Sequence, residues 1–153
     1  MRNPVVFLVL LAALGLVACE QQVDVAAEEE AIKAVIQKQL DAVRTASYEG
    51  EAAVWANEPY IVIRKSGRKI VGWDSLSVYY KKTFEERRDE PDKYRIEEFT
   101  GSNYDIHLHG NAAYVLYDEH VKGVWEGEDV SDDYKVAKYL EKMHGEWKIV
   151  AVF

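Results

Sequence analysis

The sequence predicts an α+β domain in which helices cover one face of an antiparallel sheet. Apolar residues recur at helical spacing in the first half of the chain, and the second half alternates between apolar and polar residues over long stretches. Helices that come first and long strands that follow them are typical of this class. The 153 residues are enough for one such domain and too few for two well-filled cores.

Three helical segments are expected, at residues 27–46, at residues 51–56, and between Asp74 and Pro91. In the first segment Ile32, Ile36 and Leu40 share one stripe, which predicts the face that packs on the sheet. Asp74 is expected to cap the third helix, and Pro91 is expected to end it.

Six strands are expected, at residues 60–64, 69–71, 94–109, 112–125, 134–143 and 147–153. Gly110 and Asn111 separate two of the long strands and predict a tight two-residue turn. That turn sets the register of the hairpin, so that Tyr104 is expected to pair with Tyr117.

The order of these elements resembles the NTF2-like superfamily, especially its SnoaL-like and DUF4440-type members. The resemblance rests on Gly-Trp at residues 72–73, Gly-Asn-Ala-Ala at 110–113 and Gly-Glu-Trp-Lys-Ile at 145–149. It covers residues 28–153 and implies a cone of three N-terminal helices packed on a curved antiparallel sheet, with a pocket inside. Some members of the superfamily are isomerases, dehydratases or hydrolases, and many only bind a ligand or dimerise.

Residues 1–18 have the features of a bacterial lipoprotein signal peptide. Their apolar stretch is shorter than the roughly 20 residues that span a membrane. The stretch ends in Leu-Val-Ala before Cys19, which is similar to a lipobox, so Cys19 is expected to carry lipid and to start the mature chain. Residues 19–27 are then the lipidated Cys and a short tether. Glu20 indicates, by resemblance to lipoprotein sorting, a protein held on the outer membrane and facing the periplasm.

The charge and the cysteine count exclude several classes of function. The net charge of −8 and the absence of a clustered basic face argue against nucleic acid as a partner. Because Cys19 is the only Cys, a lipid on it leaves the domain with neither a disulfide nor a catalytic thiol.

The residues expected to line the pocket come from helices and from inward-facing positions of strands. Alternation places Tyr104, Tyr117, Glu119 and Val121 on the apolar face under the helices. The full set of expected pocket residues is Trp55, Ile63, Tyr79, Tyr104, Tyr117, Glu119, Val121, Ala137 and Tyr139.

Glu119 is an acid in an otherwise apolar series, and two interpretations of it stay open. It lies at the wide end of the cone or beyond a bulge and reaches water, or it is desolvated among Tyr117, Val121 and Tyr139. The second arrangement would raise its pKa and suit proton transfer or binding of a polar ligand group. Glu119 is therefore the one candidate catalytic residue.

The chemistry of ketosteroid isomerases, which have this fold, is not expected here. By the resemblance their strand base falls at Ile63, their late acid near Ala137 and their helix Tyr within residues 36–40, and none of these positions carries the required group. No cofactor is expected. No metal site is expected either, because His107 and His120 are roughly 20 Å apart in the predicted hairpin.

Three functions stay open at this point. The pocket binds a small, partly apolar ligand; or the outer sheet face forms a homodimer or binds another envelope protein; or Glu119 is the acid–base group of an enzyme. An enclosed pocket that contains Glu119 favours the first or the third function. A filled cone with a broad apolar outer face favours the second.

Overall fold

The computed structural model describes residues 24–65 and 67–153, so the predicted signal peptide, Cys19 and part of the predicted tether lie outside the described residues. The elements are α1 (Val25–Arg44), α2 (Tyr48–Val54), β1 (Val62–Lys65), β2 (Arg68–Val71), α3 (Trp73–Asp89), β3 (Tyr94–His109), β4 (Ala112–Trp125), β5 (Glu128–Met143) and β6 (Glu146–Val152). Every predicted helix and strand is present. The largest difference in bounds is at β5, which begins at Glu128 instead of at residue 134.

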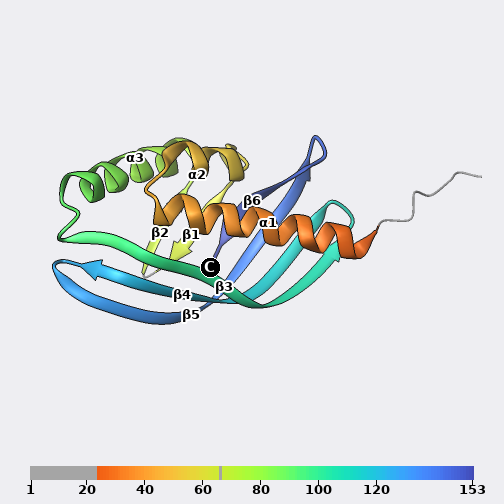
Figure 1. Cartoon of the computed structure of the whole chain (residues 1–153). Coiled ribbons are helices and arrows are strands. Elements are labelled where there is room, and N and C mark those ends of the chain that lie inside the picture. The colour runs from red at the N-terminus through yellow and green to blue at the C-terminus, as the bar shows by residue number, and fades with distance from the viewer. Residues whose placement is uncertain (1–23, 66) are drawn as a thin grey trace, which may run out of the picture.

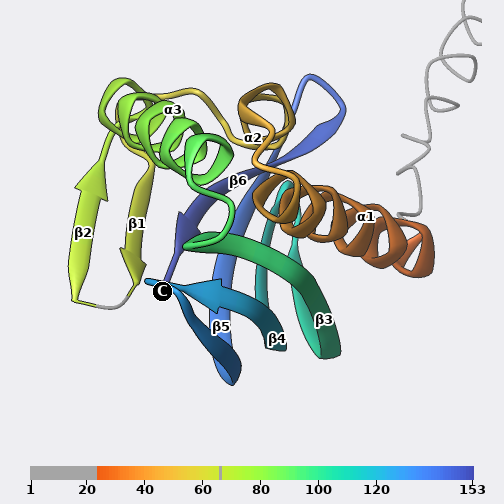
Figure 2. The same cartoon turned by 60° about the vertical axis from the view of Figure 1, so that its left-hand side comes forward.

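The six strands form a single sheet in the order β2-β1-β6-β5-β4-β3. Figure 2 shows β2 and β1 at one edge and the long β3 at the other. Neighbouring strands are antiparallel except β1 and β6, which are parallel and pair Val62 with Ala151 and Ile63 with Val152. The sheet is therefore mixed and not purely antiparallel. A parallel pair needs a long connection, and the whole chain from β2 to β5 supplies it.

The three helices pack on one face of the sheet, with α1 lying across the long strands (Figure 1). The predicted stripe of α1 forms this contact, because Ile32, Ile36 and Leu40 are all fully buried. The helix begins after Asp24, whose side chain accepts a hydrogen bond from the amide of Ala27. No helix in the described part of the chain is long and apolar enough to cross a membrane.

The start of α3 differs from the prediction. Gly72 is the N-cap and has no side chain to bond the first turn, whereas Asp74 lies inside that turn, where an acid suits the helix dipole. Gly72 has a φ of 82°, and a Cβ added to it would lie 3.3 Å from the carbonyl oxygen of Pro59. This tight, left-handed backbone explains why a glycine precedes the helix instead of a capping acid.

The hairpin of β3 and β4 has the predicted register near its turn, where His109 pairs with Ala112. Further along, a β-bulge at Asn103, which has a φ of 53°, shifts the pairing. Tyr104 and Tyr117 are therefore not direct partners, as predicted, but their rings still stack, with centroids 5.1 Å apart and planes 7° apart.

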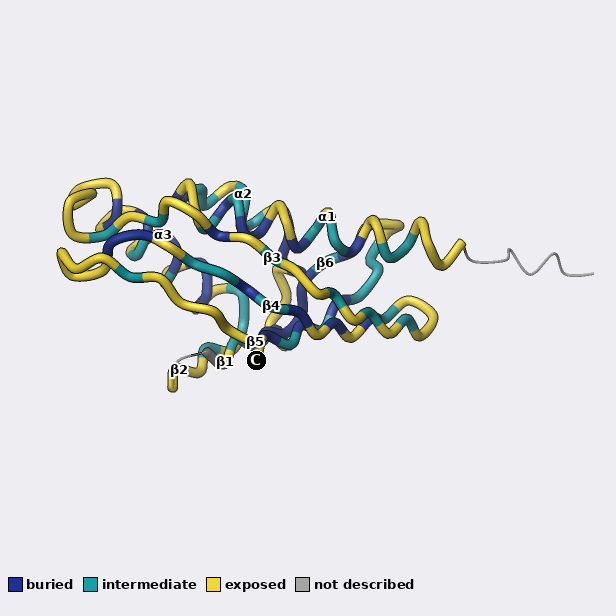
Figure 3. Tube along the Cα trace, turned by 60° about the horizontal axis from the view of Figure 1, so that its bottom comes forward, coloured by how far each residue is buried: buried dark blue, intermediate teal, exposed yellow. Residues whose placement is uncertain are grey.

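Burial follows the predicted alternation along β4. Val115 and Tyr117 are buried under the helices, whereas Tyr114 and Leu116 are each 41% exposed on the outer face. Figure 3 shows the hairpin tips exposed and buried residues concentrated in the middle of the sheet. The core thus lies between the helices and the inner sheet face, as the fold class requires.

Candidate functional site

A cavity of about 590 Å³ lies between the helices and the inner face of the sheet. Apolar side chains such as Ile63, Phe99 and Val121 form much of its wall. Its exposed lining residues are Arg68, Arg95, Trp125, Asp132 and Tyr134. These residues mark the mouth of the cavity. Trp125 is the last residue of β4, and the β4–β5 turn that follows it lies at the end of the molecule opposite to the start of α1 (Figure 1). The volume and the mostly apolar wall are typical of a small-molecule site.

A buried ion pair forms the inner end of the cavity, which we call the floor. Lys138 on β5 and Glu119 on β4 are only 1% and 2% exposed, and Nζ of the lysine lies 3.5 Å from Oε1 of the glutamate. Lys138 also donates a hydrogen bond to Oε1 of Gln39 on α1, and the Tyr117 hydroxyl donates one to Glu119. Burying either ion alone costs several kcal/mol. The opposite charge and the additional hydrogen bonds offset that cost.

Tyr117 contacts both charged residues of the floor. Burial, together with the neighbouring Glu119, raises the pKa of Tyr117 well above its ordinary value, so the phenol stays protonated and donates to the carboxylate. Nζ of Lys138 lies 4.9 Å from the centre of the Tyr117 ring. The ring therefore contacts the lysine with its face and the glutamate with its hydroxyl.

A second buried acid, Glu51 on α2, lies close to the floor. Its Oε2 accepts a hydrogen bond of 2.7 Å from the indole nitrogen of Trp55, while its Oε1 makes no hydrogen bond within the described part of the chain. Burial raises the pKa of Glu51 to about 7, although Trp55, Tyr80 and Lys138 act in the opposite direction. Glu51 therefore titrates near neutral pH, and Lys138 is close enough for its positive charge to stabilise the Glu51 carboxylate.

Four of the nine side chains predicted to form the pocket line this cavity. Those that line it are Ile63, Tyr79, Glu119 and Val121. Those that lie in the core or against it without lining the cavity are Trp55, Tyr104 and Tyr117. Of the two interpretations of Glu119, the structure has the desolvated one.

Ala137 and Tyr139 do not line the cavity as predicted, although Tyr139 is partly buried and packs against the core. They pair across β4 with Leu116 and Tyr114, which are exposed on the outer face, and paired residues share a face. Lys138, which lies between them, therefore occupies the inward position of β5.

Three polar residues of this region were missed from the sequence. Lys138 carried a signal, because its neighbours at the same parity of the strand, Val136 and Leu140, are apolar and buried. Gln39 carried none, because α1 is otherwise rich in charged and polar residues. Glu51 carried none, because the 7 residues of α2 are too few to show a periodic apolar stripe.

Two Asp–His pairs lie on the outer face of the sheet. His107 lies 3.1 Å from Asp105, and His120 binds Asp133 at 2.9 Å. Asp118 binds Lys135 on the neighbouring strand. Across residues 24–65 and 67–153, no three His, Cys, Asp or Glu side chains are arranged to hold a metal ion.

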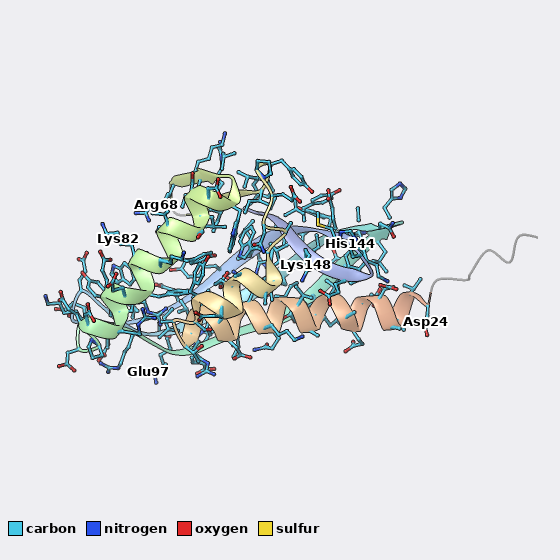
Figure 4. All side chains as sticks on the ribbon, turned by 90° about the horizontal axis from the view of Figure 1, so that it is seen from above. Asp24, Arg68, Lys82, Glu97, His144 and Lys148 are labelled. Carbon is cyan, nitrogen blue, oxygen red and sulfur yellow. The ribbon has the colours of Figure 1, made fainter. Side chains whose placement is uncertain are left out.

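A second hollow, a groove of about 620 Å³, lies between α1 and the β5–β6 hairpin. It is at the end of the molecule where Asp24 begins α1 and His144 marks the hairpin turn (Figure 4). Glu28 crosses the groove, where it binds Lys142 at 2.5 Å and the Trp147 indole nitrogen at 2.7 Å. These bonds attach the hairpin to the helix, which gives the groove's polar groups a structural role.

The cavity therefore combines an apolar wall with a buried polar floor. An ammonium and a carboxylate held side by side can donate and accept hydrogen bonds to a polar group of a bound molecule, in surroundings that strengthen each bond. A carboxylate in such a place can also take up a proton from a ligand that reaches it.

A curved sheet wrapped by three helices around a pocket defines an α+β cone. No protein-family model matches the chain, and no curated protein does. Solved structures do match it, and they include NTF2-like proteins. The chain therefore has the NTF2-like fold, as predicted.

Three of these structures show the extent of the similarity. An NTF2-like superfamily protein from Salmonella enterica serovar Typhimurium is 19% identical, with a TM-score of 0.68 over 83% of this chain and 89% of that one. An NTF2-like protein from Cytophaga hutchinsonii is 15% identical, with a TM-score of 0.65 over 82% and 94%. The association domain of C. elegans CaMKII is 20% identical, with a TM-score of 0.62 over 83% and 94%.

Proposed function

We propose that this chain is a lipid-anchored protein of the bacterial cell envelope whose cavity binds a small, partly apolar ligand. The observation that carries the proposal is the cavity of about 590 Å³ with apolar walls and the buried Lys138–Glu119 pair at its floor. Such a combination of apolar area and a few placed polar groups is what small-molecule sites share.

Ligand binding is tested by filling the cavity. Val121 lines it, so Val121→Trp should abolish the binding of a small apolar probe such as octanol, measured by titration calorimetry. Leu116→Trp is the matched control, because Leu116 lies on the same strand and faces outward. Equal probe binding by both variants would contradict the proposal. If the cavity does bind the probe, native mass spectrometry of the chain purified from its host would identify the natural ligand by its mass.

The proposed anchor rests on the lipobox-like sequence that ends in Cys19. Two or more acyl chains on a cysteine hold a protein stably on a membrane. Cys19→Ala should therefore shift the protein from the membrane fraction to the soluble fraction, or leave it unprocessed. Normal processing together with retention in the outer membrane would exclude the lipid anchor.

Assembly of a homodimer through the outer sheet face is the second candidate. Tyr114 and Leu116 on β4 expose apolar area there, and one protein with a similar fold is an association domain. Leu116→Lys should dissociate such a dimer in analytical ultracentrifugation, and a wild type that is monomeric at every concentration would exclude it.

Catalysis with Glu119 as acid–base group is the third candidate. Its burial beside Lys138 is the observation in its favour. Turnover of the bound ligand by the wild type, lost in Glu119→Gln while binding remains, would support it. An unchanged ligand after prolonged incubation would exclude it.

A further inference from the structure

Lys138 places a primary amine at the floor of a mostly apolar cavity. Among the lysines whose side chains the structure describes, it alone is buried, with an exposed fraction of 1%. Its Nζ contacts Oε1 of Glu119 and Oε1 of Gln39, and all three residues line the cavity. The amine therefore lies at the boundary of the space that a ligand would occupy.

The stability of the fold does not by itself account for this amine. Replacing a buried ion pair by apolar residues of similar volume is often neutral or stabilising. The neighbouring inward positions of β5 hold such apolar residues, Val136 and Leu140, and both are buried. An amine at the position between them is therefore a candidate for chemistry inside the cavity.

The groups around the amine suit the formation of an imine with a carbonyl compound. A lysine adds to a carbonyl carbon only as the neutral amine, so a base must first remove a proton. Glu119 lies 3.5 Å from Nζ and can take this proton, since the transfer turns two buried ions into two neutral groups. The apolar wall can hold an apolar chain beside the amine.

We infer that the ligand is an apolar aldehyde, which Lys138 holds as a reversible imine. Glu119 takes one proton from the ammonium, and the neutral amine adds to the carbonyl carbon. A second proton moves from nitrogen to the new alkoxide oxygen, and Glu119 then returns its proton to this hydroxyl group, which leaves as water. The C=O bond is exchanged for a C=N bond without oxidation or reduction, and addition of water reverses the step.

The contacts that hold the ammonium also suit the iminium ion that forms. The iminium keeps the positive charge and one N–H on the same nitrogen, so its attraction to the Glu119 carboxylate remains. Nζ lies 4.9 Å from the centre of the Tyr117 ring, whose face attracts either cation. The charge balance of the floor thus stays the same when an uncharged aldehyde binds. The inference rests on the proposed ligand-binding function and adds the chemical class of the ligand.

Trapping the imine with a reducing agent tests the inference. The full-length chain is held in phosphatidylcholine nanodiscs, whose lipid has no primary amine, and is incubated with octanal and cyanoborohydride. The reagent reduces an imine to a stable octylamine, and mass spectrometry of peptides gives the rate at which each lysine gains an octyl group. Lys138 should react at least about tenfold faster than Lys135, because the cavity holds the aldehyde next to its amine.

Lys135 is the matched control within the same chain. It lies on the same strand, and its Nζ also binds a carboxylate, that of Asp118, at 2.9 Å. Its side chain, however, is 90% exposed, so no cavity holds an aldehyde beside it.

Filling the cavity should remove the advantage of Lys138. An excess of octanol should slow the labelling of Lys138 in the unaltered chain and leave the labelling of Lys135 unchanged. Val121→Trp should slow it in the same way, because Val121 lines the cavity. Leu116→Trp, which adds the same ring to the outer face, should not.

The outcomes separate this inference from the proposed function. Binding of octanol without faster labelling of Lys138 would overturn the imine and leave ligand binding in place. Faster labelling that neither octanol nor Val121→Trp reduces would overturn the cavity as the place of the reaction. If octanol does not bind and Lys138 reacts no faster than Lys135, both the inference and the proposed function fail.

Discussion

The buried acid Glu51 should make the stability of this fold depend on pH near neutrality. The side chain is fully buried on α2, and one of its oxygens makes no hydrogen bond within the described part of the chain. Its pKa is raised from 4.5 to about 7 because burial disfavours the charged form. The substitution Glu51→Gln removes the titration and keeps an oxygen that can accept the hydrogen bond from Trp55.

The direction and size of the effect follow from the two pKa values. The folded protein keeps the proton on Glu51 up to about pH 7, whereas the unfolded chain loses it near 4.5. Between these values the folded state binds more protons, so the free energy of unfolding falls as the pH rises. At about 1.4 kcal/mol for each pH unit, the loss approaches about 3 kcal/mol and is complete above about pH 7.

The assay is urea unfolding of the wild type and of Glu51→Gln at several values between about pH 4.5 and about pH 8. Relative to the wild type, the Gln variant should gain about 3 kcal/mol across this range. Glu49→Gln is the control, because Glu49 is exposed on the same helix and should give a nearly constant difference. If Glu51→Gln also differs from the wild type by a constant amount, Glu51 does not titrate as the geometry implies.

Three further predictions concern the floor and the packing around it. Lys138→Met should destabilise the protein by about 3–5 kcal/mol, because it leaves Glu119 buried without its cation. Adding Glu119→Gln should restore much of the lost free energy of unfolding. Additive effects of the two substitutions in urea unfolding would refute this. Trp147→Ala should cost about 3–5 kcal/mol, because the ring is only 4% exposed, and a loss below about 1 kcal/mol would show that it contributes little packing. Gly123→Ala should cost about 1–3 kcal/mol or more, because its Cβ would lie 2.1 Å from the carbonyl oxygen of Arg95, and an unchanged melting temperature would contradict that approach.

The elements of this fold were predictable because each has a local cause. The stripe in α1 and the alternation in β4 are periodic signals, and the turn at Gly110 and Asn111 sets the hairpin register near it. The parallel pairing of β1 with β6 has no local cause, since it joins residues 62–63 to residues 151–152. The bulge at Asn103 was hidden as well, because nothing in the alternation shows that one strand gains a residue.

The floor of the cavity shows the same limit at the level of single side chains. Glu119 and Lys138 each stand out as a charge in an apolar, inward-facing series, yet the register places Lys138 opposite Val115, four positions from Glu119 along β4. Strand pairing alone would therefore keep them apart by about 13 Å. They meet because both side chains extend along the inner face towards the same point, and the lysine passes the ring of Tyr117 on its way. Two opposite charges buried together at inward positions of neighbouring strands cost less free energy than one of them buried alone. Each charge is therefore evidence for the other, even when the register separates them.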